Sequence, residues 1–259
     1  MAGTARDSFS GAFAEIHIRR QGTTVDLGGM DPEQVTDLRL YSGGKSDLSL
    51  LADYPNVTRL FLRGSFTGID AVGALKHLRS LRLYPSAPVD CAALAGLSLG
   101  ELAVCDHMAE HIDALFYPGL RLLEIGGQRR LGDLSFLEGA VGVEKLYLHA
   151  LPAVETLPDF GKLPKLYALK LYELHRLSDL GSLSRSNIRY LAVSLAADKV
   201  TGTRLAETLL AMPRLERANL ACVDRSSPRR YTVLQNQLRK AGRLDLLAED
   251  MDYRTWERL

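Results

Sequence analysis

The chain has 259 residues, with 32 Lys and Arg against 31 Asp and Glu and a formal net charge of +1. Its 46% of hydrophobic residues can bury enough apolar surface to offset conformational entropy, which excludes intrinsic disorder. No stretch approaches about 18 uninterrupted apolar residues, so no membrane span is expected. The balanced charge argues against a general nucleic-acid or membrane-surface binder. One property is unusual, because leucine occurs 48 times.

The first 20 residues lack the apolar core of a secretory signal peptide. Cys91, Cys105 and Cys222 are odd in number and form no C-x-x-C pair, which favours a reducing cytoplasm over a disulfide framework. Arginine outnumbers lysine by 24 to 8, as in GC-rich bacterial coding sequences. We therefore expect a bacterial, cytoplasmic protein, with a monomer as the default state.

The leucines recur in the pattern L-x-x-L-x-L, in which isoleucine or valine also fills the apolar places. Ten copies follow one another at intervals of 21 to 27 residues, the last of them looser than the others. Their ranges are 13–18, 35–40, 57–62, 78–83, 99–104, 120–125, 143–148, 166–171, 188–193 and 215–220. Such regular self-similarity predicts stacked structural repeats, each with a short strand that buries its leucines against its neighbours.

Between the copies, apolar residues recur every third position, as at Leu131, Leu134 and Leu137. A step of three predicts a turn or a short 3₁₀ segment rather than a strand or a long α-helix. Each unit is therefore expected to contain a strand, a turn and a compact return segment. After residue 224 the rhythm changes, and Tyr231, Leu234 and Leu238 are spaced as on a helix.

Two return segments read Leu-Gly-Asp-Leu-Ser-Phe-Leu at 131–137 and Leu-Ser-Asp-Leu-Gly-Ser-Leu at 177–183. With the period of 21–23 residues, they resemble those of the leucine-rich repeat family, most closely its bacterial internalin-like members. The resemblance covers about residues 13–220. One departure is that the family's turn asparagine is absent, and those positions hold Gly43, Ser65, Ser86, His107, Gln128, Leu151, Leu174, Ala196 and Val223.

The resemblance implies an α/β leucine-rich repeat solenoid. This would be a right-handed superhelix with a curved parallel sheet on its concave face and short 3₁₀ or turn segments on its convex face. It also implies a protein-interaction module, which in some members neutralises an enzyme by capping it. We expect one structural domain with an N-terminal cap at 1–34 that includes a first strand, repeats at 35–222 and a helical C-terminal cap at 223–259. A short apolar piece near Val25 suggests a hairpin in the first cap.

Residues between the repeat leucines face the open side of the sheet, because strand side chains alternate. Tyrosine and arginine, which dominate binding hot spots, are frequent there. We predict a basic-aromatic patch formed by Arg39, Tyr41, Arg59, Phe61, Arg63, Arg82 and Tyr84. We predict a second, tyrosine-rich patch formed by Lys145, Tyr147, His149, Lys170, Tyr172 and Tyr190. The repeat alignment puts His17 beside Arg39, and it leaves the middle strands bland, with Ala103, Cys105 and Gly126.

His107, Glu110 and His111 form the motif H-x-x-E-H, which binds zinc in proteases when it lies on a long helix. Here it falls in a turn and a return segment without an evident third ligand, so it is a weak metal candidate. The segment from Gly43 to Ser46 lacks the first glycine of a phosphate loop and is expected to be a strand-exit turn. Cys105 could act as a nucleophile beside His107, although free cysteines are usually structural.

We therefore predict a non-enzymatic scaffold without a cofactor. It would bind a partner protein on its Arg- and Tyr-rich concave face and neutralise or regulate that partner. The first alternative is the binding of nucleic acid or an anionic ligand by the basic patch, and it predicts strong salt dependence. A remote alternative is a metal-dependent hydrolase that uses the H-x-x-E-H motif.

Overall fold

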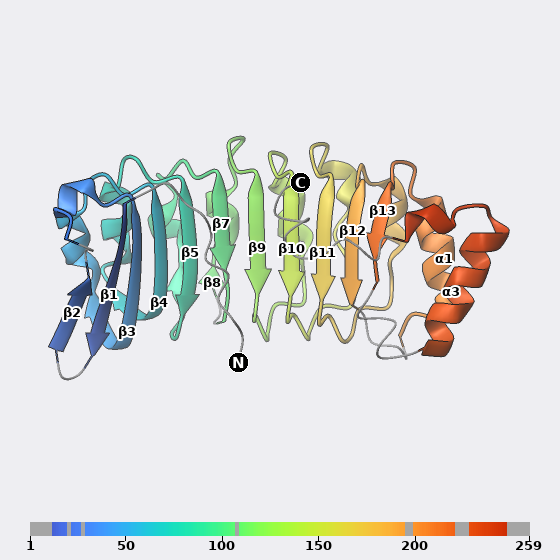
Figure 1. Cartoon of the computed structure of the whole chain (residues 1–259), viewed down its shortest axis with the longest axis horizontal. Coiled ribbons are helices and arrows are strands. Elements are labelled where there is room, and N and C mark those ends of the chain that lie inside the picture. The colour runs from blue at the N-terminus through green and yellow to red at the C-terminus, as the bar shows by residue number, and fades with distance from the viewer. Residues whose placement is uncertain are drawn as a thin grey trace.

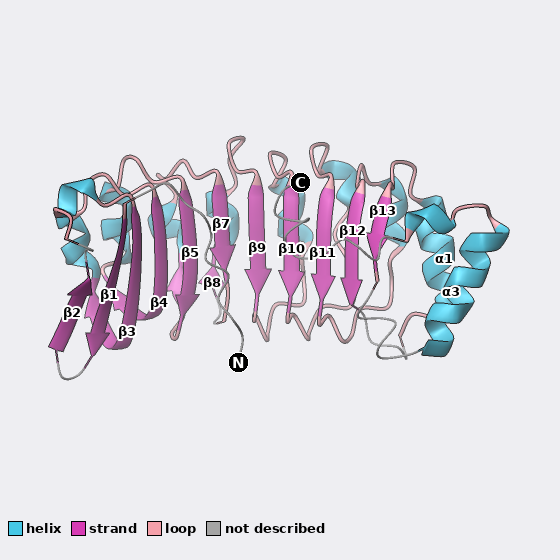
Figure 2. Ribbon diagram, viewed as in Figure 1, coloured by secondary structure: helices cyan, strands magenta, loops and turns pink. Residues whose placement is uncertain are grey.

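A computed structural model of the chain describes residues 12–19, 22–26, 29–106, 109–194, 199–220 and 228–247, with only the backbone described at 22–26. The chain forms an elongated solenoid, with a long sheet on one side and short helical turns behind it (Figures 1 and 2). In the described part of the chain, no helix is long and apolar enough to cross a membrane.

The main sheet has 11 strands, and their order follows the chain from β1 to β13 except that β2 lies outside β1 at the edge. Its strands are β1 (Phe13–Arg19), β2 (Gly22–Asp26), β3 (Asp37–Asp47), β4 (Arg59–Thr67), β5 (Ser80–Pro85), β7 (Glu101–Val104), β9 (Leu122–Gly126), β10 (Lys145–His149), β11 (Ala168–Tyr172), β12 (Tyr190–Ser194) and β13 (Arg217–Asn219). Only the pairing of β1 with β2 is antiparallel. Each of the ten predicted copies contributes one strand, which confirms the predicted solenoid.

The repeat leucines stack in register through the molecule. Leu60 pairs with Leu81, Leu81 with Leu102, and Leu102 with Leu123. These side chains are all buried, as are the corresponding leucines of the later strands. One unit cannot bury such an edge alone, so the core is a column that neighbouring units share. The high leucine content is therefore explained by the scaffold.

The return segments are mostly short 3₁₀ helices behind the sheet, as the three-residue rhythm predicted. They are η1 (Pro32–Gln34), η2 (Leu48–Asp53), η3 (Ile69–Ala74), η4 (Cys91–Leu94), η5 (Ile112–Leu115), η6 (Ser135–Gly139), η7 (Phe160–Lys162) and η8 (Gly181–Arg185). An aspartate precedes several of them and accepts a hydrogen bond from the backbone N–H two residues later. Asp133 does so for Ser135, and Asp179 does so for Gly181. This contact satisfies an N–H that would otherwise lack a partner, and it explains the repeated aspartate in these segments.

Buried side chains replace the missing turn asparagine. Gln128 is buried, accepts a hydrogen bond from the Ala109 N–H at 3.1 Å and donates to the Gly126 carbonyl at 3.3 Å. Leu151 and Leu174, at the same place in later repeats, are fully buried in the core. The turns therefore use either a polar or an apolar anchor at this position.

The register of the first strand differs from the sequence alignment. Ile16 pairs with Leu40, and His17 pairs with Tyr41, so β1 is shifted by two residues from the predicted position. The expectation that His17 lies beside Arg39 is wrong. A shift of two preserves the inward and outward alternation, and for that reason the sequence pattern alone does not distinguish the two registers.

The last return segment is an α-helix, which the three-residue rhythm did not predict. Helix α1 (Gly202–Ala211) begins after Thr201, whose side chain accepts a hydrogen bond from the Arg204 N–H at 3.1 Å. Helix α3 (Pro228–Lys240) packs against α1 and buries Leu234 and Leu238. After α3, Gly242 has a φ of +69° and the short η9 (Leu244–Leu246) follows. The division into caps and repeats stays a prediction, and residues 1–11, 221–227 and 248–259 lie outside the described residues.

Replacing Gly202 with alanine is expected to lower the free energy of unfolding by about 1–3 kcal/mol. A glycine-to-alanine change inside a helix is ordinarily favourable. Here the new β-carbon would lie 2.3 Å from the carbonyl oxygen of Arg230 in α3, so the two helices must separate. Chemical denaturation and amide hydrogen exchange in α3 measure the effect. Gly96→Ala is the matched control, since no atom lies within 4 Å of its new β-carbon. Unchanged stability and undiminished exchange protection in G202A would contradict this account of the helix contact.

Candidate functional site

The predicted contact residues lie on the face of the main sheet opposite the 3₁₀ helices, which is called the open face below. They occupy strand positions that alternate with the buried leucines. In the register of the sheet they form three rows across the strands. The rows are Arg59, Lys145 and Tyr190; Arg39, Phe61, Arg82, Tyr147 and Lys170; and Tyr41, Arg63, Tyr84, His149 and Tyr172.

Four aromatic rings form a continuous ladder across β1, β3, β4 and β5. His17 stacks on Tyr41 with ring centroids 4.8 Å apart, Tyr41 meets Phe61 at 5.4 Å, and Phe61 stacks on Tyr84 at 5.2 Å. The four rings are all partly exposed. Each contact is a cross-strand pair, direct or diagonal, of the kind that stabilises a sheet face. The result is a continuous aromatic surface whose rings are already stacked against one another.

Four arginines lie beside this ladder, two of them partly buried and two exposed. Asp37 forms ion pairs with Arg39 at 3.9 Å and with Arg59 at 3.6 Å. The Arg39 guanidinium also lies over the Phe13 ring, 4.8 Å from its centroid. Arg63 and Arg82 are exposed on either side of the ladder. The patch therefore combines two arginines paired with Asp37 and two arginines whose side chains are exposed.

The tyrosine-rich patch is held together by two alanines. Tyr147, Tyr167, Tyr172 and Tyr190 pack around the buried Ala168 and Ala192. Because alanine side chains are small, the neighbouring tyrosine rings can pack against the face of the sheet. The Lys170 ammonium sits 4.5 Å from the centroid of the Tyr147 ring, a cation–π contact.

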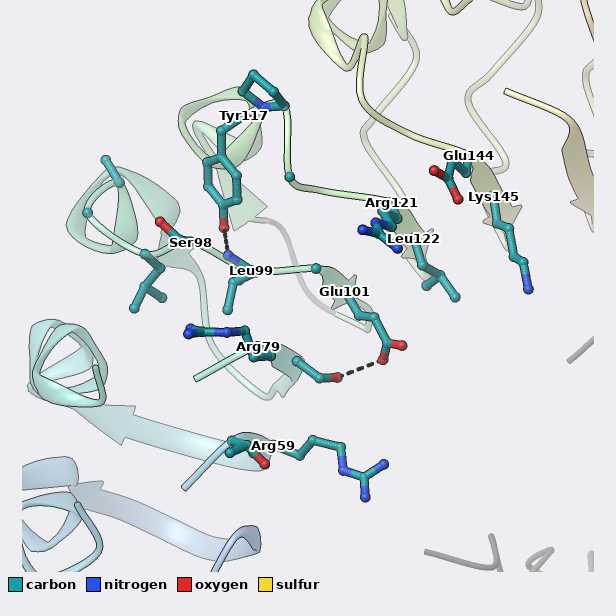
Figure 3. A pocket seen from close by; sticks show the side chains of 18 of the residues that line it. Arg59, Arg79, Ser98, Leu99, Glu101, Tyr117, Arg121, Leu122, Glu144 and Lys145 are labelled. Carbon is teal, nitrogen blue, oxygen red and sulfur yellow. Dashed lines mark hydrogen bonds between the residues drawn. The ribbon is translucent and has the colours of Figure 1, made fainter. Parts of the chain in front are cut away.

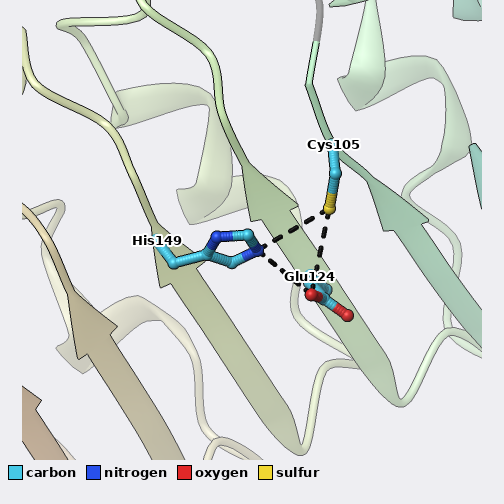
Figure 4. A group of neighbouring side chains, drawn as sticks. All are labelled: Cys105, Glu124 and His149. Carbon is cyan, nitrogen blue, oxygen red and sulfur yellow. Dashed lines mark hydrogen bonds and ion pairs between the residues drawn. The ribbon is translucent and has the colours of Figure 1, made fainter. Parts of the chain in front are cut away.

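The middle of the open face carries a polar cluster that the sequence analysis did not predict. Cys105, which directly follows β7, Glu124 in the middle of β9 and His149 at the end of β10 point toward one another (Figure 4). His149 Nε2 lies 3.1 Å from Glu124 Oε1 and 3.7 Å from Cys105 Sγ. The Cys105 thiol donates to Glu124 Oε1 at 3.8 Å. The expectation of a bland middle is therefore wrong.

Gly126 creates the space for this cluster. It pairs with His149 in the sheet and lies between that residue and the strand of Cys105. A β-carbon on Gly126 would lie 2.1 Å from two atoms of the His149 ring, so the ring occupies the volume that any other residue would fill. The sequence does contain a signal for this cluster. Cys105, Gly126 and His149 occupy the same outward position in three successive repeats, and the glycine lies between the other two.

The pKa values of the Cys105 thiol and the Glu124 carboxyl group are shifted in opposite directions. Burial raises the pKa of the Cys105 thiol well above its ordinary value, and the nearby charge of Glu124 raises it further. Burial alone would also raise the pKa of Glu124. The hydrogen bond from His149 and the positive charges of His149, Arg82 and Lys170 outweigh it, so the pKa of Glu124 lies below its ordinary value. A thiol held in its protonated form is a poor nucleophile.

A groove of about 1130 Å³ runs along the N-terminal ends of β4, β5, β7, β9, β10 and β11 (Figure 3). Its lining includes Arg59 from the first predicted patch and Lys145 from the second, so it connects the two. Two hydrogen bonds brace its wall. Ser80 donates to Glu101 at 3.0 Å, and the Leu99 N–H donates to the Tyr117 hydroxyl oxygen at 2.6 Å. Basic groups outnumber acidic ones in this lining, which comprises among others Arg59, Arg79, Arg121, Lys145, Glu101 and Glu144.

The remaining motifs of the sequence analysis have local structural roles. Within H-x-x-E-H, Glu110 belongs to the short strand β8 (Ala109–Glu110), which pairs with β6 (Val89–Asp90) rather than lying on a helix. His111 Nδ1 lies 2.9 Å from Asp90 Oδ1, and His107 lies outside the described residues. The glycines before Lys45 form an irregularity inside β3 rather than a strand-exit turn.

No protein-family model and no curated protein sequence matches the chain. Several solved structures do match the chain. An internalin (inlF) from Listeria monocytogenes superposes with a TM-score of 0.54 at 19% identity, over 73% of this chain and 55% of that structure. The chain thus spans little more than half of that relative. Internalin C2 (inlC2) from the same organism matches with a TM-score of 0.45 at 19% identity, over 64% of this chain and 82% of that one.

Proposed function

The chain has the leucine-rich repeat fold of the internalins, and from that fold we propose that it is a non-catalytic scaffold that binds a partner protein on its open face. Leucine-rich repeat solenoids act chiefly in this way, as the resemblance in sequence implied. A binding scaffold of this kind neutralises or regulates its partner by covering the partner's functional surface.

The observation that carries the proposal is the aromatic ladder formed by His17, Tyr41, Phe61 and Tyr84. A large aromatic surface that is partly exposed and bordered by arginine has the composition of an interface hot spot. The rings are already stacked against one another, so a partner would immobilise few side chains on binding.

The partner surface complementary to this patch would be apolar at its centre and acidic at its rim. Arg63 is exposed at the edge of the ladder, where it can pair with a carboxylate of the partner. The groove along the N-terminal ends of the strands continues this basic character toward Lys145 and the tyrosine-rich patch. We propose that one partner contacts both patches across β7 and β9, the strands that lie between them.

Phe61→Ala is expected to weaken partner binding by about 2 kcal/mol, roughly 30-fold, because the side chain is the central member of the ladder. Arg63→Ala is expected to have a smaller effect, about tenfold. The measurement begins with capture from a lysate of the source organism on immobilised wild-type protein, followed by mass spectrometry. The captured protein is then titrated against the wild-type protein and both variants by calorimetry.

Arg185→Ala is the matched control, since Arg185 is 67% exposed at the end of η8 on the opposite side of the sheet. It should bind like the wild type. A specific partner that binds F61A and R63A with unchanged affinity, while both variants keep their thermal stability, would overturn the assignment of the surface. Retention of nucleic acid alone, lost steeply with added salt, would instead support the anionic-ligand alternative.

A further inference from the structure

The separations within the Cys105–Glu124–His149 cluster match those of ligands around a tetrahedral zinc ion. Standard bond lengths of about 2.0–2.3 Å place two ligand atoms about 3.5–3.6 Å apart when one is sulfur and about 3.4 Å apart for nitrogen and oxygen. The observed separations are 3.7 Å for Sγ to Nε2, 3.8 Å for Sγ to Oε1 and 3.1 Å for Nε2 to Oε1. The three donor atoms thus already surround one point.

The geometry does not fit a catalytic relay. In a nucleophile–base–acid relay the imidazole uses one nitrogen for the nucleophile and the other for the acid. Here the same atom, His149 Nε2, faces both the Cys105 sulfur and the Glu124 carboxylate. Donor atoms that converge in this way suit the binding of a cation better than the passage of a proton along a line.

The surroundings hold these donors in place. The cluster stands on three neighbouring strands of a rigid sheet, and Gly126 leaves room for the His149 ring. Tyr84 lies beside the Cys105 thiol on the adjacent strand β5.

We propose that Cys105, Glu124 and His149 bind one divalent transition-metal ion of the zinc class. Thiolate and imidazole select zinc over magnesium or calcium, because these soft and borderline ligands suit transition metals. Binding releases the thiol proton to solvent, and the metal–sulfur bond replaces the S–H bond.

Three protein ligands leave the fourth tetrahedral position open. Cys105 lies at the bottom of the site with 1% exposure, whereas the Glu124 and His149 side chains are 19% and 35% exposed. The open position therefore lies toward the open face of the sheet, on the side of the partly exposed Glu124 and His149 side chains. Water fills it in the isolated protein.

The test uses full-length, tag-free protein stripped with a chelator and titrated with zinc and, separately, with cobalt. One ion per chain is expected. The cobalt form should show the sulfur-to-metal charge-transfer absorption and the intense visible bands of a tetrahedral thiolate site. Cys105→Ser and His149→Asn should each weaken binding by at least about 100-fold. Gly126→Ala changes no ligand but displaces the His149 ring, and it should weaken binding by about 10–100-fold.

The controls are Cys91→Ser, which removes a buried cysteine in η4, and His111→Ala, which removes a ligand of the H-x-x-E-H motif. Both should bind zinc like the wild type. The proposal is overturned by the absence of stoichiometric binding, by a cobalt spectrum without the thiolate band, or by binding that survives H149N but not H111A. The absence of a thiolate band in the cobalt spectrum of the wild type overturns the proposal even if a variant fails to fold. No partner is needed, so this result and that of the partner-binding test are independent.

Discussion

Replacing Phe160 with alanine is expected to lower the free energy of unfolding by about 3–5 kcal/mol. Phe160 is a fully buried side chain in η7 and among the largest in the core. Removing its ring leaves a cavity that the rigid units on either side cannot close. Because each repeat contacts only its neighbours, the loss falls on the packing of η7 against η6 and η8. Domains are stable by only about 5–15 kcal/mol, so this single change removes a large share.

Equilibrium denaturation in urea, followed by circular dichroism, measures this loss. Val141→Ala provides the control, since Val141 is 47% exposed and its truncation should change stability by less than about 0.5 kcal/mol. A two-state transition with a lower midpoint and an unchanged slope is expected for F160A. A loss of unfolding free energy below about 1 kcal/mol would contradict the conclusion that packing of the return segments stabilises the core.

Replacing Gly64 with alanine is expected to destabilise the protein by about 2–4 kcal/mol. Gly64 has a φ of +124°, a region that residues with a side chain rarely adopt. A β-carbon there would lie 2.2 Å from the Ser42 carbonyl oxygen on the adjacent strand. The register of β3 and β4 shifts at this place, between Tyr41 and Lys45. Both backbone strain and a steric clash therefore oppose the substitution.

Gly44→Ala is the matched control, because Gly44 belongs to the same irregularity but has no atom within 4 Å of its new β-carbon. Its stability should stay within about 0.5 kcal/mol of that of the wild type. Thermal and urea denaturation of the two variants give the comparison. Equal stability of G64A and G44A would show that the strand irregularity adapts freely, contrary to the close packing described above.

Much of the fold could be predicted because the repeat pattern is local and is copied ten times. Inward leucines at a spacing of 21–23 residues specify stacked strands, and the three-residue rhythm specifies the 3₁₀ turns. Two features could not be predicted from this pattern, namely the register of β1 and the helix α1. Strand β1 keeps its alternation when shifted by two residues, and α1 forms where the last unit is longer and Thr201 caps a helix.

The candidate surface was predictable in composition but not in geometry. Strand alternation identified the rows that hold Phe61 and Tyr84, and the structure places those residues on the open face. The inclusion of His17 in the ladder depends on the register of β1, which requires the packed structure. The predicted contact residues themselves stay a prediction until a partner is titrated.

The amino-acid sequence by itself determined the repeat, the inward leucine column and the identity of the outward rows, because these follow from residue spacing along one chain. Only the tertiary structure decided which outward residues meet. Cys105, Glu124 and His149 are 19 and 25 residues apart in the chain, and they converge because their strands are neighbours in register. The missing side chain of Gly126 lets the His149 ring reach across β9. Such a contact depends on the shape of the space between strands, which the spacing of residues along a sequence does not describe.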